Sequence, residues 1–137
     1  MDYYDVSLVD GYNLPIQITP IAGTFHKVGN SHYDCNAAGC HGDLNGHCPH
    51  ELAQKGAGGH TVGCKSACLA FNTDEYCCRG AHNKPETCKS RNWKVNYPAI
   101  FKKSCPDAYS YAYDDHSSTF TCHSNGAHKT GYVVKFC

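Results

Sequence analysis

Two groups of acidic residues in this sequence lie beside residue types that could help them bind a sugar. Asp5 and Asp10 flank a short apolar segment, and Asp114 and Asp115 follow a segment with three tyrosines. Aromatic rings stack on sugar faces, and carboxylates accept hydrogen bonds from hydroxyl groups or act as acid and base in hydrolysis. On these residues alone two interpretations stay open. One is a carbohydrate site, and the other, which the composition favours, is turn-forming Asp beside tyrosines of a β-sheet.

The sequence holds 11 Cys and 10 His, which could ligate a metal ion or form disulfides. Zinc modules need paired ligands at spacings such as C-x2-C or H-x3–5-H. Cys64 and Cys68 have three residues between them, and Cys77 and Cys78 are adjacent, so neither pair fits. The spacing favours structural disulfides over a metal site and predicts a secreted or otherwise oxidised protein. Because 11 is odd, at least one thiol has no partner within the chain.

Other kinds of chemistry lack their sequence signatures. There is no G-x-S-x-G elbow, no G-x-G-x-x-G turn and no phosphate-binding loop, so no nucleotide or other cofactor is expected. The 12 basic and 12 acidic side chains cancel, which argues against a nucleic-acid partner. No apolar run approaches the roughly 18 residues of a transmembrane helix. The N-terminus lacks the basic and apolar segments of a signal peptide, so none is expected in this sequence.

The elements that must position these residues fall into three zones, which suit one domain or part of a larger one. Residues 2–33 and 106–137 are β-like because apolar and polar residues alternate. Residues 34–105 hold nine of the 11 Cys, with many Gly and Asn. Within the first zone, residues 10–13 are typical of a hairpin or a loop connection.

Local patterns predict two helices and two strands. A helix is expected over residues 61–71, because Cys64 and Cys68 lie one helical turn apart. A second short helix is expected over residues 98–103, with Pro at its favoured first position. The expected strands are residues 118–122 and a last strand within residues 132–136, where apolar side chains alternate.

Five longer segments together resemble the thaumatin-like proteins, also called pathogenesis-related family 5. They are residues 4–15 (YDVSLVDGYNLP), 75–80 (EYCCRG), 105–115 (CPDAYSYAYDD), 118–122 (STFTC) and 133–137 (VVKFC). These ordered matches are spread over essentially the whole chain, which is therefore identified as a member of the family. The His-rich loops and the segment around residues 55–62 are more similar to animal members, those of arthropods, than to plant ones.

The resemblance implies a mainly β fold. This would be a thaumatin-like β-sandwich, incomplete because its N-terminal strands are missing, with a disulfide-rich loop region that contains one or two short helices. The sandwich portion would comprise residues 1–34 and 106–137, and the loop region residues 35–105. The family's domain continues upstream of the first residues here, so an N-terminally truncated chain is expected, and a monomer.

Alignment with the family also implies a set of disulfides. The implied pairs are Cys35–Cys122, Cys40–Cys105, Cys48–Cys64, Cys68–Cys77 and Cys78–Cys88. Cys137 is left unpaired, because its family partner lies near the missing N-terminus.

The family has an acidic cleft lined by an Arg, a Glu and three Asp. The three Asp carry over to Asp5, Asp10 and Asp114, whereas the Arg and the Glu lie upstream and have no counterpart here. Members bind β-1,3-glucan, some hydrolyse it, many inhibit fungal growth, and some permeabilise membranes. The resemblance therefore implies a secreted antifungal defence protein whose partner is β-1,3-glucan or another fungal cell-wall polysaccharide.

Two alternatives to this binding role stay open. One is an endo-β-1,3-glucanase activity, expected of the full-length protein because glycoside hydrolysis needs two suitably placed carboxyl groups and the family's Glu is absent here. The other is a truncated product without function, since missing strands leave unpaired sheet edges that favour aggregation.

Overall fold

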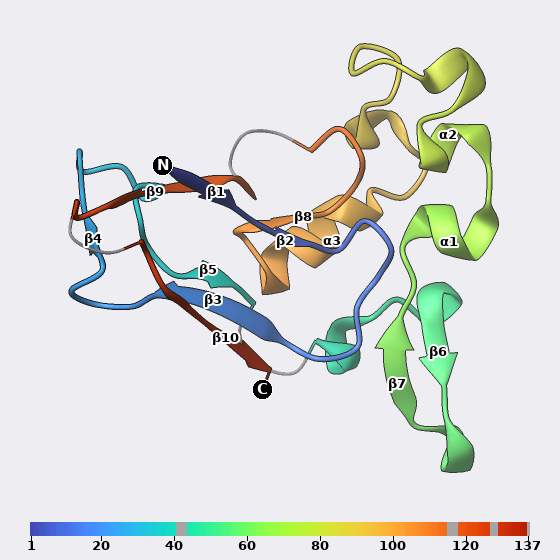
Figure 1. Ribbon diagram of the computed structural model, residues 1–137. Coiled ribbons are helices and arrows are strands. Elements are labelled where there is room, and N and C mark those ends of the chain that lie inside the picture. Colours follow the sequence, from blue (N-terminus) through green and yellow to red (C-terminus); the bar gives the residue numbers. More distant parts are fainter. Residues whose placement is uncertain (41–43, 115–117, 127–128, 137) are drawn as a thin grey trace.

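The computed structural model describes residues 1–40, 44–114, 118–126 and 129–136. Within these residues, two three-stranded antiparallel sheets, in the orders β1-β9-β4 and β10-β3-β5, lie one above the other in Figure 1. The strands of the first are β1 (Asp2–Tyr4), β9 (Phe120–Ser124) and β4 (Phe25–His26). Those of the second are β10 (Tyr132–Phe136), β3 (Ile16–Pro20) and β5 (Ala38–Gly39). Each sheet thus combines strands from both ends of the chain.

A short parallel pair joins the sheets to the rest of the molecule. In it, β2 (Val6–Ser7) pairs with β8 (Ala108–Tyr109). The backbone N–H of Leu8 extends this pairing, donating to the Tyr109 carbonyl at 2.7 Å. Residues about 100 positions apart in sequence therefore run side by side.

The disulfide-rich region occupies the other side of the molecule in Figure 1. It contains a hairpin of β6 (Ala53–Lys55) and β7 (Thr61–Cys64), and the helices α1 (Ala67–Phe71), α2 (Asp74–Cys77) and α3 (Tyr97–Ser104). Short 3-10 turns connect them, at Asn45–His47, His50–Leu52, Ala57–Gly59, Gly80–His82 and Ser90–Asn92. Among the described residues, no helix is long and apolar enough to span a membrane.

Local side-chain caps explain where the helices begin. The side chains of Ser66, Thr73 and Asn96 accept hydrogen bonds from the backbone N–H groups of Leu69, Tyr76 and Ala99, at the starts of α1, α2 and α3. Each such cap satisfies an amide that the helix itself leaves without a partner. The helix predicted over residues 98–103 is confirmed within α3, which has Pro in its first turn.

The helix predicted over residues 61–71 is wrong in its first half. Thr61–Cys64 is the strand β7, and the helix starts only after the cap at Ser66. Antiparallel pairing with β6 overrides the one-turn spacing of the two cysteines. The strand predicted over residues 118–122 is displaced, because β9 runs from Phe120 to Ser124. The strand predicted within residues 132–136 is confirmed as β10.

Residues 10–13 form a loop connection and not a hairpin, because β2 pairs with β8 whereas β3 pairs with β10 and β5. The loop is fixed to β7 by reciprocal backbone hydrogen bonds between Tyr12 and Cys64, of 2.8 and 2.7 Å. Gly11 lies against this contact with φ +100°, and a Cβ atom there would stand 2.3 Å from the Cys64 carbonyl oxygen. Only glycine allows this close approach.

The main core lies where the parallel pair meets the disulfide-rich region. Its most enclosed side chains include Leu44, Leu52 and Phe101, each at most 2% exposed. A second cluster surrounds Phe120, whose ring lies 5.5 Å from that of Tyr4 and 5.0 Å from that of Tyr33. Large aliphatic side chains are few, so cystines fill part of the interior.

Disulfides link these parts in the same five pairs that the family alignment implies. They are Cys35–Cys122, Cys40–Cys105, Cys48–Cys64, Cys68–Cys77 and Cys78–Cys88, with Cα–Cα distances from 4.3 to 5.8 Å. Adjacent Cys77 and Cys78 can serve two different partners because Cys78 has a left-handed backbone, φ 54°, that ends α2. Cys137 lies outside the described residues.

The contact at Gly11 predicts a strong effect of adding one methyl group. Gly11→Ala should lower the free energy of unfolding by more than about 2 kcal/mol, because it combines a left-handed backbone with a backbone clash. Urea unfolding measures the difference. Gly23→Ala is the matched control, since Gly23 has φ +86° and nothing within 4 Å of an added Cβ. Equal effects of the two substitutions would contradict the close approach to β7.

Candidate functional site

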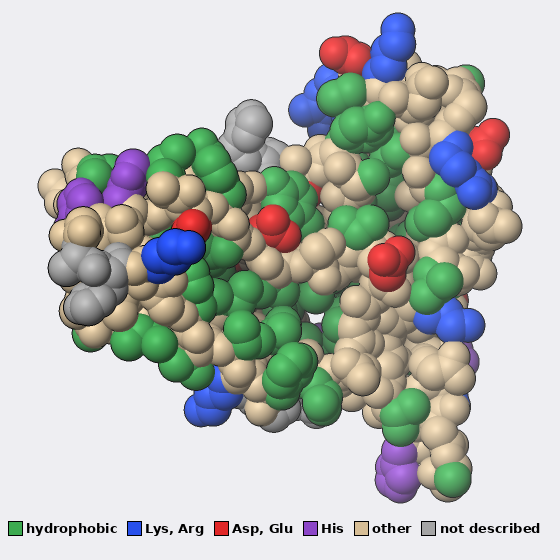
Figure 2. All heavy atoms as spheres, viewed as in Figure 1, with side chains coloured by type: hydrophobic (Ala, Val, Ile, Leu, Met, Phe, Trp, Pro, Cys, Tyr) green, Lys and Arg blue, Asp and Glu red, His purple; other side chains and the backbone are tan. Residues whose placement is uncertain are grey.

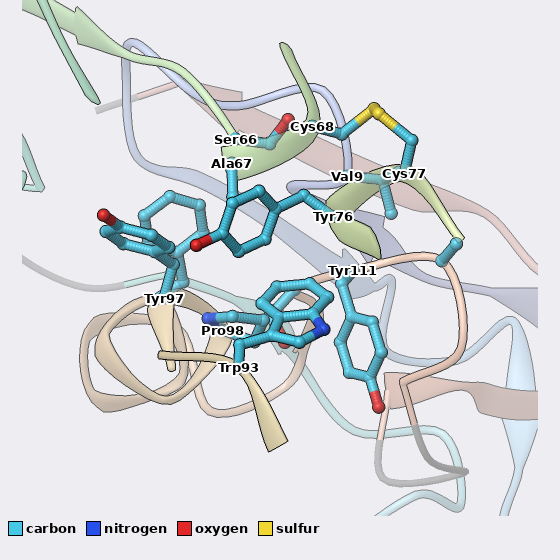
Figure 3. A pocket seen from close by; sticks show the side chains of 13 residues that line it. Val9, Ser66, Ala67, Cys68, Tyr76, Cys77, Trp93, Tyr97, Pro98 and Tyr111 are labelled. Carbon is cyan, nitrogen blue, oxygen red and sulfur yellow. A yellow bond between two sulfur atoms is a disulfide. The ribbon is translucent and has the colours of Figure 1, made fainter. Parts of the chain in front are cut away.

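An aromatic pocket opens between the helices and the loop that follows β8 (Figure 3). It encloses about 40 Å³, and the aromatic residues that line it are Tyr76, Trp93, Tyr97, Phe101 and Tyr111. The ring of Trp93 lies edge-on to Tyr76, at 4.9 Å, and to Tyr111, at 5.5 Å. Trp93 and Tyr97 are buried whereas Tyr76 and Tyr111 are half-buried, so the latter two are the rings that a ligand could reach.

The Cys68–Cys77 disulfide borders this pocket and fixes α1 against α2 (Figure 3). The pocket is also lined by Val9 and Ser110, which belong to the two segments that the parallel pair joins. The pocket therefore lies next to the chain segments that carry the predicted acidic residues.

Asp5 and Asp10 are both exposed, at the two ends of the segment that contains β2. Within the described residues, no hydrogen bond or ion pair occupies either carboxylate. The parallel pairing of Val6 with Ala108 places this segment beside the one that leads to Asp114. Figure 2 shows isolated acidic side chains on this face, over β2 and the loop after it, and not one continuous acidic patch.

Asp114 differs from the other two because its side chain is only 9% exposed and is held internally. One carboxylate oxygen accepts hydrogen bonds from the Ser110 backbone N–H, at 2.8 Å, and the Ser110 hydroxyl, at 2.7 Å. The same oxygen lies 3.1 Å from the Lys102 ammonium, which also donates to the Ser118 hydroxyl at 2.7 Å. These contacts fix the loop after β8 to α3. Asp115 lies outside the described residues.

Sequence reasoning did not identify the pocket, or the carboxylate of Glu51 beside it. Burial raises the pKa of the Tyr97 hydroxyl, and the charge of Glu51 and a hydrogen bond to it raise that pKa further. Tyr97 therefore stays a hydrogen-bond donor at neutral pH. The aromatic residues of the pocket come from three separate parts of the chain, and no local spacing connects them.

Comparison with known proteins gives one consistent answer. The model of the Thaumatin family matches residues 1–137. The chain is 48% identical over 136 residues to Thaumatin-like protein 1 of Pyrus pyrifolia and 52% identical over 136 residues to Pathogenesis-related protein 5 of Arabidopsis thaliana. It is 49% identical over 136 residues to a protein of Prunus avium named Glucan endo-1,3-beta-glucosidase. Each match covers 99% of this chain and 49% of the relative, so the chain spans about half the length of these relatives.

The network around Asp114 predicts a measurable coupling. Lys102→Met should lower the free energy of unfolding by about 1–3 kcal/mol, because it leaves a partly buried carboxylate without its cation. The double variant Lys102→Met/Asp114→Asn should lose less free energy of unfolding than the sum of the losses of the two single variants. A double-mutant cycle by urea unfolding measures this difference.

A matched control is Arg79→Gln, which removes an exposed ion pair with Asp74 at 3.5 Å. That pair is solvent-screened, so its loss should change stability by less than about 1 kcal/mol. If the effects of the Lys102 and Asp114 substitutions on the free energy of unfolding are additive, the two side chains do not stabilise each other.

Proposed function

The chain belongs to the thaumatin family, and we propose that it is part of a secreted, defence-type protein that binds β-1,3-glucan of fungal cell walls. The binding face comprises the segment from Asp5 to Asp10 and the rim of the aromatic pocket at Tyr76 and Tyr111. The observation that carries this proposal is the juxtaposition of two unengaged, exposed carboxylates with reachable aromatic rings.

The chemistry of the face suits a polysaccharide. Carboxylates accept hydrogen bonds from vicinal hydroxyl groups, and tyrosine rings stack on the apolar faces of sugars. Asp5 and Asp10 stand at opposite ends of one short segment, which suits contacts with successive sugar units. Tyr111 and Tyr76 lie beside it and would hold the ring faces. The name of the Prunus avium relative, Glucan endo-1,3-beta-glucosidase, supports β-1,3-glucan as the ligand.

Secretion is supported by the crosslinking of the described part of the chain. Ten of its cysteines are paired, and such a dense framework is stable only in an oxidising compartment.

Hydrolysis is proposed for the longer protein and not for this chain. Glycoside hydrolysis needs one protonated carboxyl group to assist the leaving group and one ionised group as nucleophile or base. Asp114 is engaged internally by Lys102 and Ser110, whereas Asp5 and Asp10 are exposed to water at the two ends of one segment. Binding with negligible turnover is therefore the expected behaviour.

The test is a laminarin pull-down beside a reducing-sugar assay. The wild-type chain should bind laminarin with negligible release of reducing sugar. Asp5→Asn and Asp10→Asn should each weaken binding roughly three- to tenfold, the equivalent of one typical hydrogen bond. Tyr111→Ala should weaken it by a similar factor.

Glu86→Gln is the control, because Glu86 is an exposed carboxylate that neither lines the pocket nor belongs to the segment from Asp5 to Asp10. It should bind as the wild type does. Robust turnover abolished by Asp5→Asn would instead favour an active endo-glucanase in this chain. Absence of laminarin binding by the folded wild type would refute the binding role and favour a fragment without function.

A further inference from the structure

Two histidines face each other where the edge strand β4 pairs with β9. His26 and His123 are direct partners in the antiparallel register, so their side chains project from the same face of the sheet. Their ring centroids are 5.9 Å apart and the rings are inclined by 38°. His26 is exposed and His123 half-buried. Figure 2 shows histidine side chains gathered on the surface over these two strands.

A hydrogen bond fixes the form of one ring. The Nδ1 atom of His26 lies 2.8 Å from the backbone carbonyl oxygen of Ser124. A carbonyl oxygen can only accept, so Nδ1 carries the proton and Nε2 of the neutral ring presents a lone pair. Metal-binding histidines are commonly oriented in this way, with one ring nitrogen bound to a backbone carbonyl and the other to the ion.

From this geometry we propose that His26 and His123 form a two-histidine site for a divalent transition-metal ion, with Cu²⁺ bound most tightly. Two imidazoles on one ion, with metal–nitrogen bonds of about 2.0 Å, have centroids about 5 Å apart. The observed 5.9 Å separation needs only a small rotation of the side chains to reach that value. Neutral imidazole nitrogens suit copper and zinc, and the general order of affinity places Cu²⁺ above Ni²⁺ and Zn²⁺.

Water completes the coordination shell. Within the described residues, no group of three or more His, Cys, Asp or Glu is placed to hold an ion together, so the protein supplies two ligands. The cation next in sequence, Lys27, is directed to the Asn36 side-chain oxygen at 2.6 Å. Square-planar Cu²⁺ with two imidazoles and two waters is a compatible arrangement.

The expected consequence of binding is a link between β4 and β9. The strand β4 is only two residues long and lies at a sheet edge, so few interactions hold it. The two histidines are neighbours only in the folded chain, and an ion bound to both therefore stabilises the native state.

The experiment is a calorimetric titration of the chain with CuCl₂, with ZnCl₂ in a parallel series. His26→Gln and His123→Gln should each weaken the tightest Cu²⁺ binding tenfold or more, because the second ligand acts at high effective concentration. The double variant should be no weaker than either single variant. In amide NMR spectra, substoichiometric Cu²⁺ should first broaden the signals of β4 and β9.

The matched control is His60→Gln, which removes an exposed histidine of the β6–β7 connection and should leave the tight site unchanged. Neither histidine side chain is fully buried, so His26→Gln and His123→Gln should both keep the native fold. The amide NMR spectra of the two variants check this. If the losses of Cu²⁺ affinity simply add in the double variant, or if they equal the loss in His60→Gln, the two histidines bind ions independently. Either result would overturn the proposal. Laminarin binding is a separate readout that removal of either histidine should not alter.

Discussion

Covalent crosslinking is the constraint on which the rest of this structure depends. The described strands are two to five residues long and the helices four to eight, so none is stable by itself. Cys35–Cys122 and Cys40–Cys105 join positions 87 and 65 residues apart, and both cystines are buried. Closing loops of this length contributes roughly 4 kcal/mol each by restricting the unfolded chain. That contribution replaces part of the apolar core that the sequence does not provide.

The same framework determines which carboxylates are available for a ligand. Cys40–Cys105 ends α3 beside the β2–β8 pair, and α3 supplies the Lys102 ammonium that holds Asp114. Asp114 thereby stabilises the loop that carries Tyr111. Asp5 and Asp10 lie on the outer side of the pair, where water surrounds them. One acidic residue thus acts as a structural anchor, and two remain open to hydroxyl groups.

Both proposed sites arise where segments from opposite ends of the chain meet. The proposed glucan face lies where residues near Asp5 run beside residues near Tyr109, and the proposed metal site lies where His26 faces His123. In each case a backbone pairing between distant segments brings the functional groups together in the folded chain. Such sites need little reorganisation on binding, which favours affinity.

The sequence by itself determined the family, through long ordered segments, and the features that depend on neighbouring residues. The helix α3 follows from the Asn96 cap and Pro98, and β10 from its alternating side chains. Only the tertiary structure decided the partner of β2, the late start of α1 and the internal role of Asp114. It also placed His26 opposite His123, two residues that lie too far apart in sequence to match the spacing of a zinc module. The physical reason is that periodicity and capping act over a few residues, whereas strand pairing and ion pairing join residues that local sequence patterns do not connect.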